Sequence, residues 1–303
     1  MAQAADAPRS PTVHQVGVTL EMIKWEHSVF ALPFALTGAV LAAQGIPAAR
    51  QLLWIVVCMV AARSAGMSFN RYADAELDAE NPRTRMRAIP AGTLSKSFVG
   101  WFTAAAALVF VLAAAQLNRL TLELSPVALA VVLGYSYAKR FTRWSHLVLG
   151  LALGIAPSAA WIAIRGSLHP RILVLTAIVI CWVGGFDILY ACQDAAHDRR
   201  VGLRSLPAAL GVPAAFHVAR ALHLAMLALS ILLVHLFALG PIAWAGLAIV
   251  AALLAYEHAI ISPGDLSRMN AAFFTMNGFI SIVFFLAVAV AVLAKDGWHA
   301  FAR

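Results

Sequence analysis

Long apolar runs recur from one end of this 303-residue chain to the other. Each run is long enough to cross about 30 Å of hydrocarbon as a helix that rises ~1.5 Å per residue. The runs do not alternate polar and apolar residues, as the strands of a membrane barrel do. We therefore predict an all-α polytopic membrane protein. About nine transmembrane helices are expected, near Ser28–Gln44, Leu52–Phe69, Val99–Leu117, Leu120–Ala138, Leu147–Ile164, Ile172–Ala191, Ala214–Ala238, Ile242–Ile261 and Ala271–Ala294.

The composition agrees with this class. Hydrophobic residues make up 62% of the chain and charged residues 12%, whereas a soluble domain has roughly 45–50% and about 25%. We expect one transmembrane domain over residues 1–303, with residues 1–15 as a polar N-terminal tail and no cleaved signal peptide. The stretch His14–Phe30 mixes charged and apolar residues and is expected to lie at the membrane interface as an amphipathic helix.

The net charge of +8 follows from the loops between the apolar runs. With a cytoplasmic N-terminus, most of the 22 Lys and Arg residues fall on the cytoplasmic side, as the positive-inside rule requires. Membrane topology thus explains the charge, and we expect no nucleic acid as a partner. All 14 acidic residues except Glu123 and Asp296 also fall on that side, which the rule does not require.

One group of acids directly follows the second apolar run, in NRYADAELDAENPRTRMRAIPAG. Its residues Asn70, Asp74 and Asp78 stand four apart, so on a helix their side chains share one face. We call these three residues the first acidic stripe.

A second group of acids, in DILYACQDAAHD, lies at the end of the sixth run. Asp187, Asp194 and Asp198 again share a helix face, and we call them the second acidic stripe. Two facing stripes would repel each other without cations between them. Mg²⁺ fits, because it prefers oxygen ligands, uses one or two carboxylates and completes its shell with water and phosphate oxygens. Solvated helix ends would give one such stripe, but two stripes, each followed by arginines, favour a magnesium site.

Basic side chains accompany both stripes. Arg71 lies beside Asn70, and in GYSYAKR the spacing puts Tyr135 and Lys139 on one helix face, just before Arg140. Arginine binds phosphate or carboxylate oxygens through two parallel hydrogen bonds, and lysine acts as a point charge. Acids for Mg²⁺, bases for phosphate and an apolar bundle together predict a substrate with a diphosphate head and a long hydrocarbon tail.

These motifs resemble the signatures of the UbiA superfamily of membrane prenyltransferases. NRYADAELDAENPRTRMRAIPAG is similar to the first signature, an NxxxDxxxD stripe followed by NPRTxxRPLPxG, although Arg71 stands where the superfamily often has Asp. YACQDAAHDRRVGLRSLPAALG is similar to the second signature, and GYSYAKR to the helix end between them. The resemblance covers nearly the whole chain. It implies a nine-helix bundle that attaches an isoprenoid chain to an acceptor, often an aromatic ring.

The resemblance also implies the metal ligands. Asn70, Asp74 and Asp78 would hold one Mg²⁺ together with the diphosphate. Asp194 and Asp198 would hold a second Mg²⁺.

The substrate contacts follow from the same resemblance. Arg71, Tyr135 and Lys139 would contact the diphosphate, while Asp187 and Arg140 would lie toward the acceptor. The aromatic carbon ortho to a phenol would attack the allylic cation, and Arg140 would pair with the acceptor's carboxylate. Asp187 is the candidate base, so all five aspartates of the two stripes are candidate catalytic residues.

Two further stretches, EHSVFALPFAL and YEHAIISPGDLSRMNAAFFTMNGFISIVFF, resemble a bacterial subgroup of the superfamily. This implies transfer of a polyprenyl group to 4-hydroxybenzoate in respiratory quinone biosynthesis. It also implies a bacterial inner membrane, with lipid around the bundle. The distribution of basic residues predicts that the active site faces the cytoplasm. The same chemistry on a hydroxynaphthoate, in menaquinone biosynthesis, is the alternative.

Two other functions are compatible with parts of the pattern. A membrane transporter is one, because acids at membrane depth often mark an ion path. The acids here, however, lie at the ends of runs on one side, without an inverted repeat of broken helices. A prenyltransferase with a porphyrin or non-aromatic acceptor is the other.

Overall fold

The computed structural model describes residues 11–23 and 28–301. In these ranges eight helices are long and apolar enough to cross a membrane, and a shorter apolar helix covers Ala31–Ala43. The prediction of an all-α membrane fold with about nine spans is confirmed. The long helices are α2 (Ser28–Ala43), α3 (Ala49–Ala73), α5 (Lys96–Ala115), α6 (Arg119–Gly134), α8 (Ser145–Arg165), α9 (Ile172–Ala191), α12 (Val212–Leu236), α13 (Pro241–Ala259) and α14 (Asn277–Phe301).

The N-terminal helix α1 covers Pro11–Met22. It includes the last residues of the stretch that the sequence suggests is a polar tail. Residues 1–10 and 24–27 lie outside the described residues, so the middle of the expected interfacial helix His14–Phe30 is not described, and its last three residues belong to α2. Met22 and Ile23 pack against Leu94 and Val99, so the end of α1 is attached to the start of α5.

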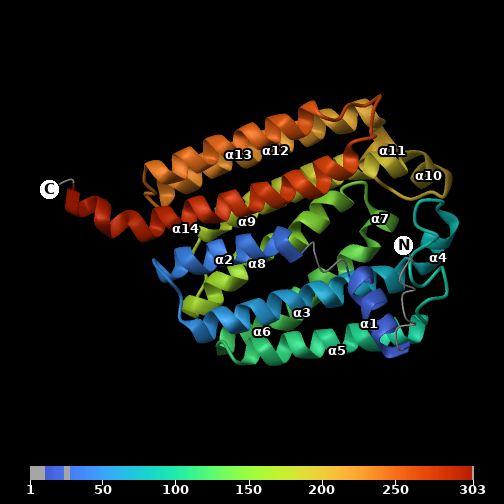
Figure 1. Cartoon of the computed structure of the whole chain (residues 1–303), viewed down its shortest axis with the longest axis horizontal. Coiled ribbons are helices and arrows are strands. Elements are labelled where there is room, and N and C mark those ends of the chain that lie inside the picture. The colour runs from blue at the N-terminus through green and yellow to red at the C-terminus, as the bar shows by residue number, and fades with distance from the viewer. Residues whose placement is uncertain (1–10, 24–27, 302–303) are drawn as a thin grey trace, which may run out of the picture.

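The long helices run side by side, and the short ones gather at one end of the bundle (Figure 1). Those short helices are α4 (Ala75–Glu80), α7 (Ala138–Phe141), α10 (Ala195–Arg200) and α11 (Leu206–Leu210). Helices α2, α8, α9, α12, α13 and α14 pack neighbour against neighbour, while α3, α5 and α6 pack together beside α2 and α8. The residues of both acidic stripes therefore come to the same end of the bundle.

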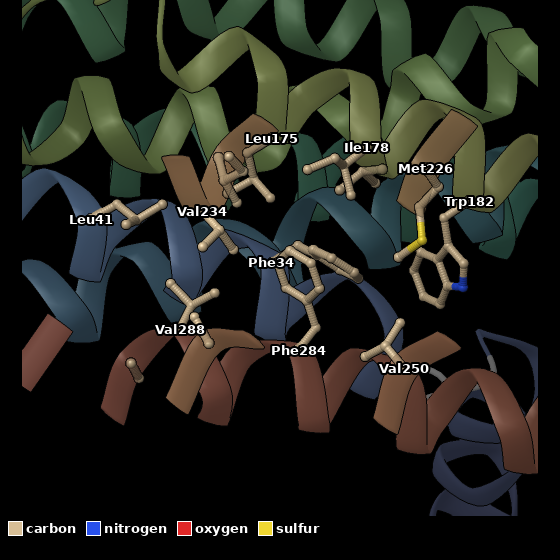
Figure 2. Close-up of a cluster of buried hydrophobic side chains, with 14 of the residues drawn as sticks. Phe34, Leu41, Leu175, Ile178, Trp182, Met226, Val234, Val250, Phe284 and Val288 are labelled. Carbon is tan, nitrogen blue, oxygen red and sulfur yellow. The ribbon is translucent and has the colours of Figure 1, made fainter. Parts of the chain in front are cut away.

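The largest core lies among the helices of the first group (Figure 2). Phe34 of α2 is central to it, with ring centroids 4.9 Å from Trp182 and 5.2 Å from Phe284. Lipid is as apolar as these side chains, so they stabilise the bundle by close packing more than by leaving water.

Glycines let the backbones of the central helices approach. A Cβ at Gly38 of α2 would lie 2.3 Å from the carbonyl oxygen of Pro157 in α8. A Cβ at Gly150 of α8 would lie 2.7 Å from the carbonyl oxygen of Ile180 in α9. Small residues at such contacts are the usual basis of tight packing between membrane helices. They fix α8 between α2 and α9.

Candidate active site

Each of the three helices that carry the motifs breaks at the same end of the bundle. Asp74, between α3 and α4, has φ −99° and ψ 10°, and Asp194, before α10, has φ −100° and ψ 0°. Tyr137, before α7, has φ −91° and ψ −8°. This sparsely populated bridge region is common among active-site residues. The spacing of each stripe suggests one continuous helix. In the structure, each stripe instead crosses a break between two helices.

The four-residue relation survives the first break. The Asp74 N–H still donates to the carbonyl oxygen of Asn70, and the Asp78 N–H donates to that of Asp74. The side chains of the first acidic stripe thus remain on one side of the chain although the helix bends.

A cavity of about 980 Å³ brings all the predicted site residues together. Its polar lining includes Asn70, Arg71, Asp74, Asp78, Tyr135, Lys139, Arg140, Asp187, Asp194 and Asp198. Most of the apolar lining comes from α2, α3, α6 and α8, and α5 and α9 also contribute to it. Along α8 the lining runs from Ser145, the first residue, to Ala163, near the last. The cavity is therefore deep and largely apolar, with most of its charged residues near its mouth, where α4, α7 and α10 lie.

The first acidic stripe is linked to a base from another helix. The Asn70 side-chain amide donates to Asp74 over 3.0 Å, and Arg140 of α7 donates to the other oxygen of Asp74 over 3.1 Å. Arg71 donates to the Asn70 side chain over 3.4 Å. Burial raises the pKa of the Asp74 carboxyl, although the hydrogen bond from Arg140 acts to lower it. Asp74 is thus a poorly solvated carboxylate with a cation beside it.

Asp78 is buried and belongs to the same network. Arg87 donates to both of its carboxylate oxygens, over 2.7 and 2.9 Å. The Thr84 hydroxyl donates to the Asp78 carbonyl oxygen, which ties the following loop back to α4. Arg87 is therefore the ion-pair partner of the last acid of the first stripe.

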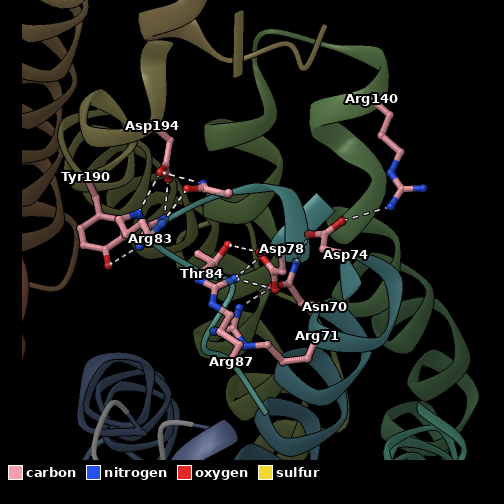
Figure 3. A network of polar contacts seen from close by, with 11 residues as sticks. Asn70, Arg71, Asp74, Asp78, Arg83, Thr84, Arg87, Arg140, Tyr190 and Asp194 are labelled. Carbon is pink, nitrogen blue, oxygen red and sulfur yellow. Dashed lines mark hydrogen bonds and ion pairs between the residues drawn. The ribbon is translucent and has the colours of Figure 1, made fainter. Parts of the chain in front are cut away.

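Arg83 connects the two acidic stripes (Figure 3). Its Nε donates to Asp194 over 2.8 Å, and its Nη2 donates to the second oxygen of the same carboxylate. Its guanidinium also lies 5.4 Å from the ring centroid of Tyr190. Burial acts to lower the pKa of Arg83, but the hydrogen bond and charge of Asp194 outweigh it and raise that pKa. The pair joins the loop after the first stripe to the second stripe.

Asn81 supports this pair from both sides. Its side-chain oxygen accepts from the Arg83 N–H over 3.0 Å, and its amide donates to Asp194 over 3.1 Å. The first contact is the local turn that Asn makes readily with its own backbone. The Asn-Pro step in the sequence signals this turn, although the sequence alone does not indicate its contact with Asp194.

The remaining two aspartates have different surroundings. Asp198 is almost fully buried, 3.7 Å from Lys139, and its Oδ2 has no hydrogen-bond partner in the described part of the chain. Asp187 accepts a hydrogen bond from His146, a residue that the sequence does not single out. Asp187 therefore stands apart from the ion pairs of the other four aspartates.

Arg63 is a second residue that sequence reasoning left aside. It lies in α3, seven residues or roughly 10 Å before Asn70, and it lines the cavity. Its Nε is buried without a hydrogen-bond partner in the described structure. A guanidinium inside an otherwise apolar lining is a candidate site for a carboxylate of a bound molecule.

The donor set fits Mg²⁺. Over the described residues, no three His, Cys, Asp or Glu side chains form a cluster that could hold a metal ion by themselves. Mg²⁺ does not need one, since it binds through one or two carboxylates and takes its other oxygens from water and phosphate. Both stripes offer such carboxylates at the cavity mouth, and Oδ2 of Asp198, 3.7 Å from Lys139 and without a hydrogen bond in the described structure, is a buried oxygen of the right kind.

A membrane bundle with a deep apolar cavity and a charged mouth has the chemistry to bind a lipid-tailed anion. The comparisons with known proteins identify the class more closely. The chain belongs to the UbiA prenyltransferase family, which matches residues 31–283. It is an integral membrane prenyltransferase, as the motifs suggest, and the transporter alternative finds no support.

Individual relatives agree with this assignment. The 4-hydroxybenzoate octaprenyltransferase of Vibrio cholerae is 35% identical over 233 residues, which cover 75% of this chain and 79% of the relative. The apo structure of a UbiA homolog from Aeropyrum pernix K1 has a TM-score of 0.80 and 34% identity, covering 88% of this chain and 98% of that one. A UbiA homolog from Archaeoglobus fulgidus bound to GPP and Mg²⁺ shares the fold, with a TM-score of 0.65 and 19% identity over 91% and 99% of the two chains.

Proposed function

We propose that this enzyme transfers a polyprenyl group from an allylic polyprenyl diphosphate to 4-hydroxybenzoate, in respiratory quinone biosynthesis. The observation that carries the proposal is the meeting of the two acidic stripes, with their basic partners, at the mouth of one apolar cavity. The name of the Vibrio cholerae relative supports the acceptor, and the GPP-bound homolog supports the donor class.

The cavity suits such a donor. The apolar lining between α3, α6 and α8 would hold the hydrocarbon tail. At the mouth, Arg71, Lys139 and Tyr135 would contact the diphosphate, as predicted from the sequence. Arg83 and Arg87 lie beside the same aspartates and would add two guanidinium groups to that set.

The two acidic stripes would hold Mg²⁺. Asn70, Asp74 and Asp78 would contribute to one ion, and Asp194 and Asp198 to a second. Bound there, Mg²⁺ would supply charge that makes the diphosphate a better leaving group.

The acceptor would lie deeper than the diphosphate, beside Asp187. The sequence predicts that Arg140 pairs with the carboxylate of the acceptor. In the structure, Arg140 donates hydrogen bonds to Asp74 and to the carbonyl oxygen of Ala73 at the mouth. Arg63 is placed further inside the cavity and has an unpartnered Nε. We therefore propose Arg63 beside Arg140 as a partner for this carboxylate.

Residues of the cavity would have three further roles in the transfer reaction. The apolar lining would exclude water from the allylic cation, which water would otherwise capture. The paired arginines would hold the diphosphate in place after the carbon–oxygen bond breaks. Asp187 would accept the proton that the ring carbon loses when aromaticity returns.

The charge distribution supports the placement of the site. Most basic residues lie in the loops on the side of the two stripes, which the positive-inside rule assigns to the cytoplasm. We propose a bacterial inner-membrane enzyme whose single transmembrane domain opens its active site toward the cytoplasm.

A transfer assay on the purified protein tests the proposal. Mg²⁺ and a long-chain prenyl diphosphate would be supplied, with 4-hydroxybenzoate in one reaction and a hydroxynaphthoate in the other. A prenylated benzoate is the expected product. A product from the naphthoate alone would contradict the proposed acceptor and move the enzyme to menaquinone biosynthesis. Binding of the diphosphate without transfer to either would contradict the proposed acceptor class.

A further inference from the structure

The imidazole of His146 joins three elements behind the cavity. His146 is the second residue of α8, and its side chain is completely buried. Its Nδ1 lies 2.7 Å from Oδ2 of Asp187 in α9. Its Nε2 lies 3.3 Å from the backbone nitrogen of Leu206, the first residue of α11. No motif in the sequence signals this arrangement.

The backbone fixes which imidazole nitrogen carries the proton. The Leu206 N–H can only donate, so Nε2 of His146 accepts and is unprotonated. The proton is then on Nδ1, which donates to the Asp187 carboxylate. Leu206 is itself fully buried, so another tautomer would leave its N–H without a partner at a substantial cost. His146 is therefore a neutral donor of fixed orientation.

Asp187 faces two environments. Oδ2 points to His146, while the residue also lines the cavity and its side chain is 21% exposed. In the described part of the chain, the structure gives Oδ1 no hydrogen-bond partner. One oxygen is thus held from behind, and the other is free for a molecule in the cavity.

We propose that His146 is a positioning residue, which holds Asp187 so that Oδ1 faces the aromatic acceptor. This rests on the proposed function. During transfer, the carbon–oxygen bond to the diphosphate breaks first, and the diphosphate leaves with that electron pair. A pair of ring electrons then forms the new carbon–carbon bond to the allylic cation. The ring carbon then loses its proton to Oδ1 of Asp187, and the electrons of the carbon–hydrogen bond return to the ring. His146 keeps its own proton throughout.

The competing explanation is that His146 has a purely structural role, because the loop that leads from α10 into α11 is also bonded to α7. The Arg204 N–H donates to the Lys139 carbonyl oxygen over 2.7 Å, and the Arg204 side chain donates to that of Phe141 over 2.9 Å. Loss of His146 could therefore loosen α11 and, through it, the helix that carries Lys139. The test must separate the contact to Asp187 from the contact to Leu206.

Two amide variants separate these contacts. In His146→Asn the amide N–H replaces Nδ1 and can still donate to Asp187, while the contact to Leu206 is lost. In His146→Gln the longer side chain reaches the position of Nε2 and keeps Leu206, while the donor to Asp187 is lost. We expect His146→Gln to lower kcat about 10- to 100-fold, with KM for the prenyl diphosphate within about twofold. His146→Asn is expected to recover most of that loss.

A double-mutant cycle with Asp187→Asn completes the test. If His146 acts through Asp187, His146→Gln costs little further activity in the Asp187→Asn background. Equal losses in His146→Asn and His146→Gln, with parallel drops in melting temperature, would overturn the proposal in favour of a structural role. Additive losses in the cycle would overturn it as well. A wild-type enzyme that transfers no prenyl group would instead contradict the proposed function, so the two failures are distinguishable.

Discussion

Arg83 and Asp194 stand 111 residues apart in the chain, and the guanidinium of one holds both carboxylate oxygens of the other. The pair belongs to two different motifs, one after α3 and one after α9. It therefore fixes how far apart the two acidic stripes lie, and so the space left for a diphosphate and its metal ions.

The first prediction concerns this pair. Arg83→Ala is expected to lower kcat/KM for the prenyl diphosphate roughly 10- to 100-fold, because Asp194 loses its partner and the stripes lose their link. Arg85→Ala is the matched control, since Arg85 is an exposed arginine of the same loop without an ion pair in the described structure. Steady-state assays on the two variants measure the difference. Equal effects would show that loop charge alone matters.

The aspartates at the two helix breaks give the second prediction. Asp74→Asn and Asp194→Asn should each reduce transfer by at least about 100-fold while the folded protein stays in the membrane. Both residues line the cavity mouth and would lose a charged oxygen ligand. Glu80→Gln, at an exposed position on α4, should retain nearly full activity. Near-normal transfer by either aspartate variant would contradict the metal-binding role of its stripe.

Metal removal gives the third prediction. Chelation of divalent cations should abolish transfer, and added Mg²⁺ should restore it, because the diphosphate and five aspartates otherwise repel each other. The melting temperature should change little, since the acids keep their arginine and lysine partners. Activity and thermal unfolding would be measured on the same chelated sample. Full activity after exhaustive chelation would count against magnesium dependence.

The fourth prediction concerns which of two arginines binds the carboxylate of the acceptor. Arg63→Gln should raise KM for 4-hydroxybenzoate about tenfold or more, because it removes a guanidinium from the inner cavity. Arg140→Gln should act more on the diphosphate, since Arg140 bonds Asp74 at the mouth. Separate KM values for the two substrates measure this. The reverse pattern would return the carboxylate to Arg140, as the sequence suggests.

A fifth prediction tests the packing of α2 against α8. Gly38→Ala places a Cβ 2.3 Å from a backbone oxygen of α8, so the helices must separate. A loss of about 1–3 kcal/mol in the free energy of unfolding is expected. Gly45→Ala, where a Cβ would meet nothing within 4 Å, is the control. Thermal unfolding in the same detergent compares the two, and equal stability would contradict the close contact.

The sequence contains strong signals for the bundle and for the charged residues of the site. Long apolar runs without alternation admit few folds, and their ends mark which side each acid occupies. The last run shows the limit of such reasoning. The predicted span Ala271–Ala294 begins within a π-helical turn, Ala271–Met276, and α14 itself starts at Asn277. A change in helix type leaves no mark on hydrophobicity.

The pairings within the site are harder to predict. Which arginine reaches Asp194 depends on how the loop after α4 folds across to α9, and several neighbouring arginines look equivalent in sequence. The helix breaks at Asp74 and Asp194 involve neither Gly nor Pro, so the local sequence contains no residue that predicts them. His146 is hidden for another reason, since a lone histidine at the start of an apolar helix looks like any interfacial residue.

The ion pairs at the mouth also govern how the two ligands would enter. Asp74, Asp78 and Asp194 each hold an arginine, so a metal ion arriving alone must compete with guanidinium groups for carboxylate oxygens. A diphosphate arriving alone must compete with carboxylates for the same guanidinium groups. When both arrive, acids and bases exchange one set of partners for another without leaving any charge unmatched. Each ligand therefore strengthens the binding of the other by the same factor, and their uptake is cooperative.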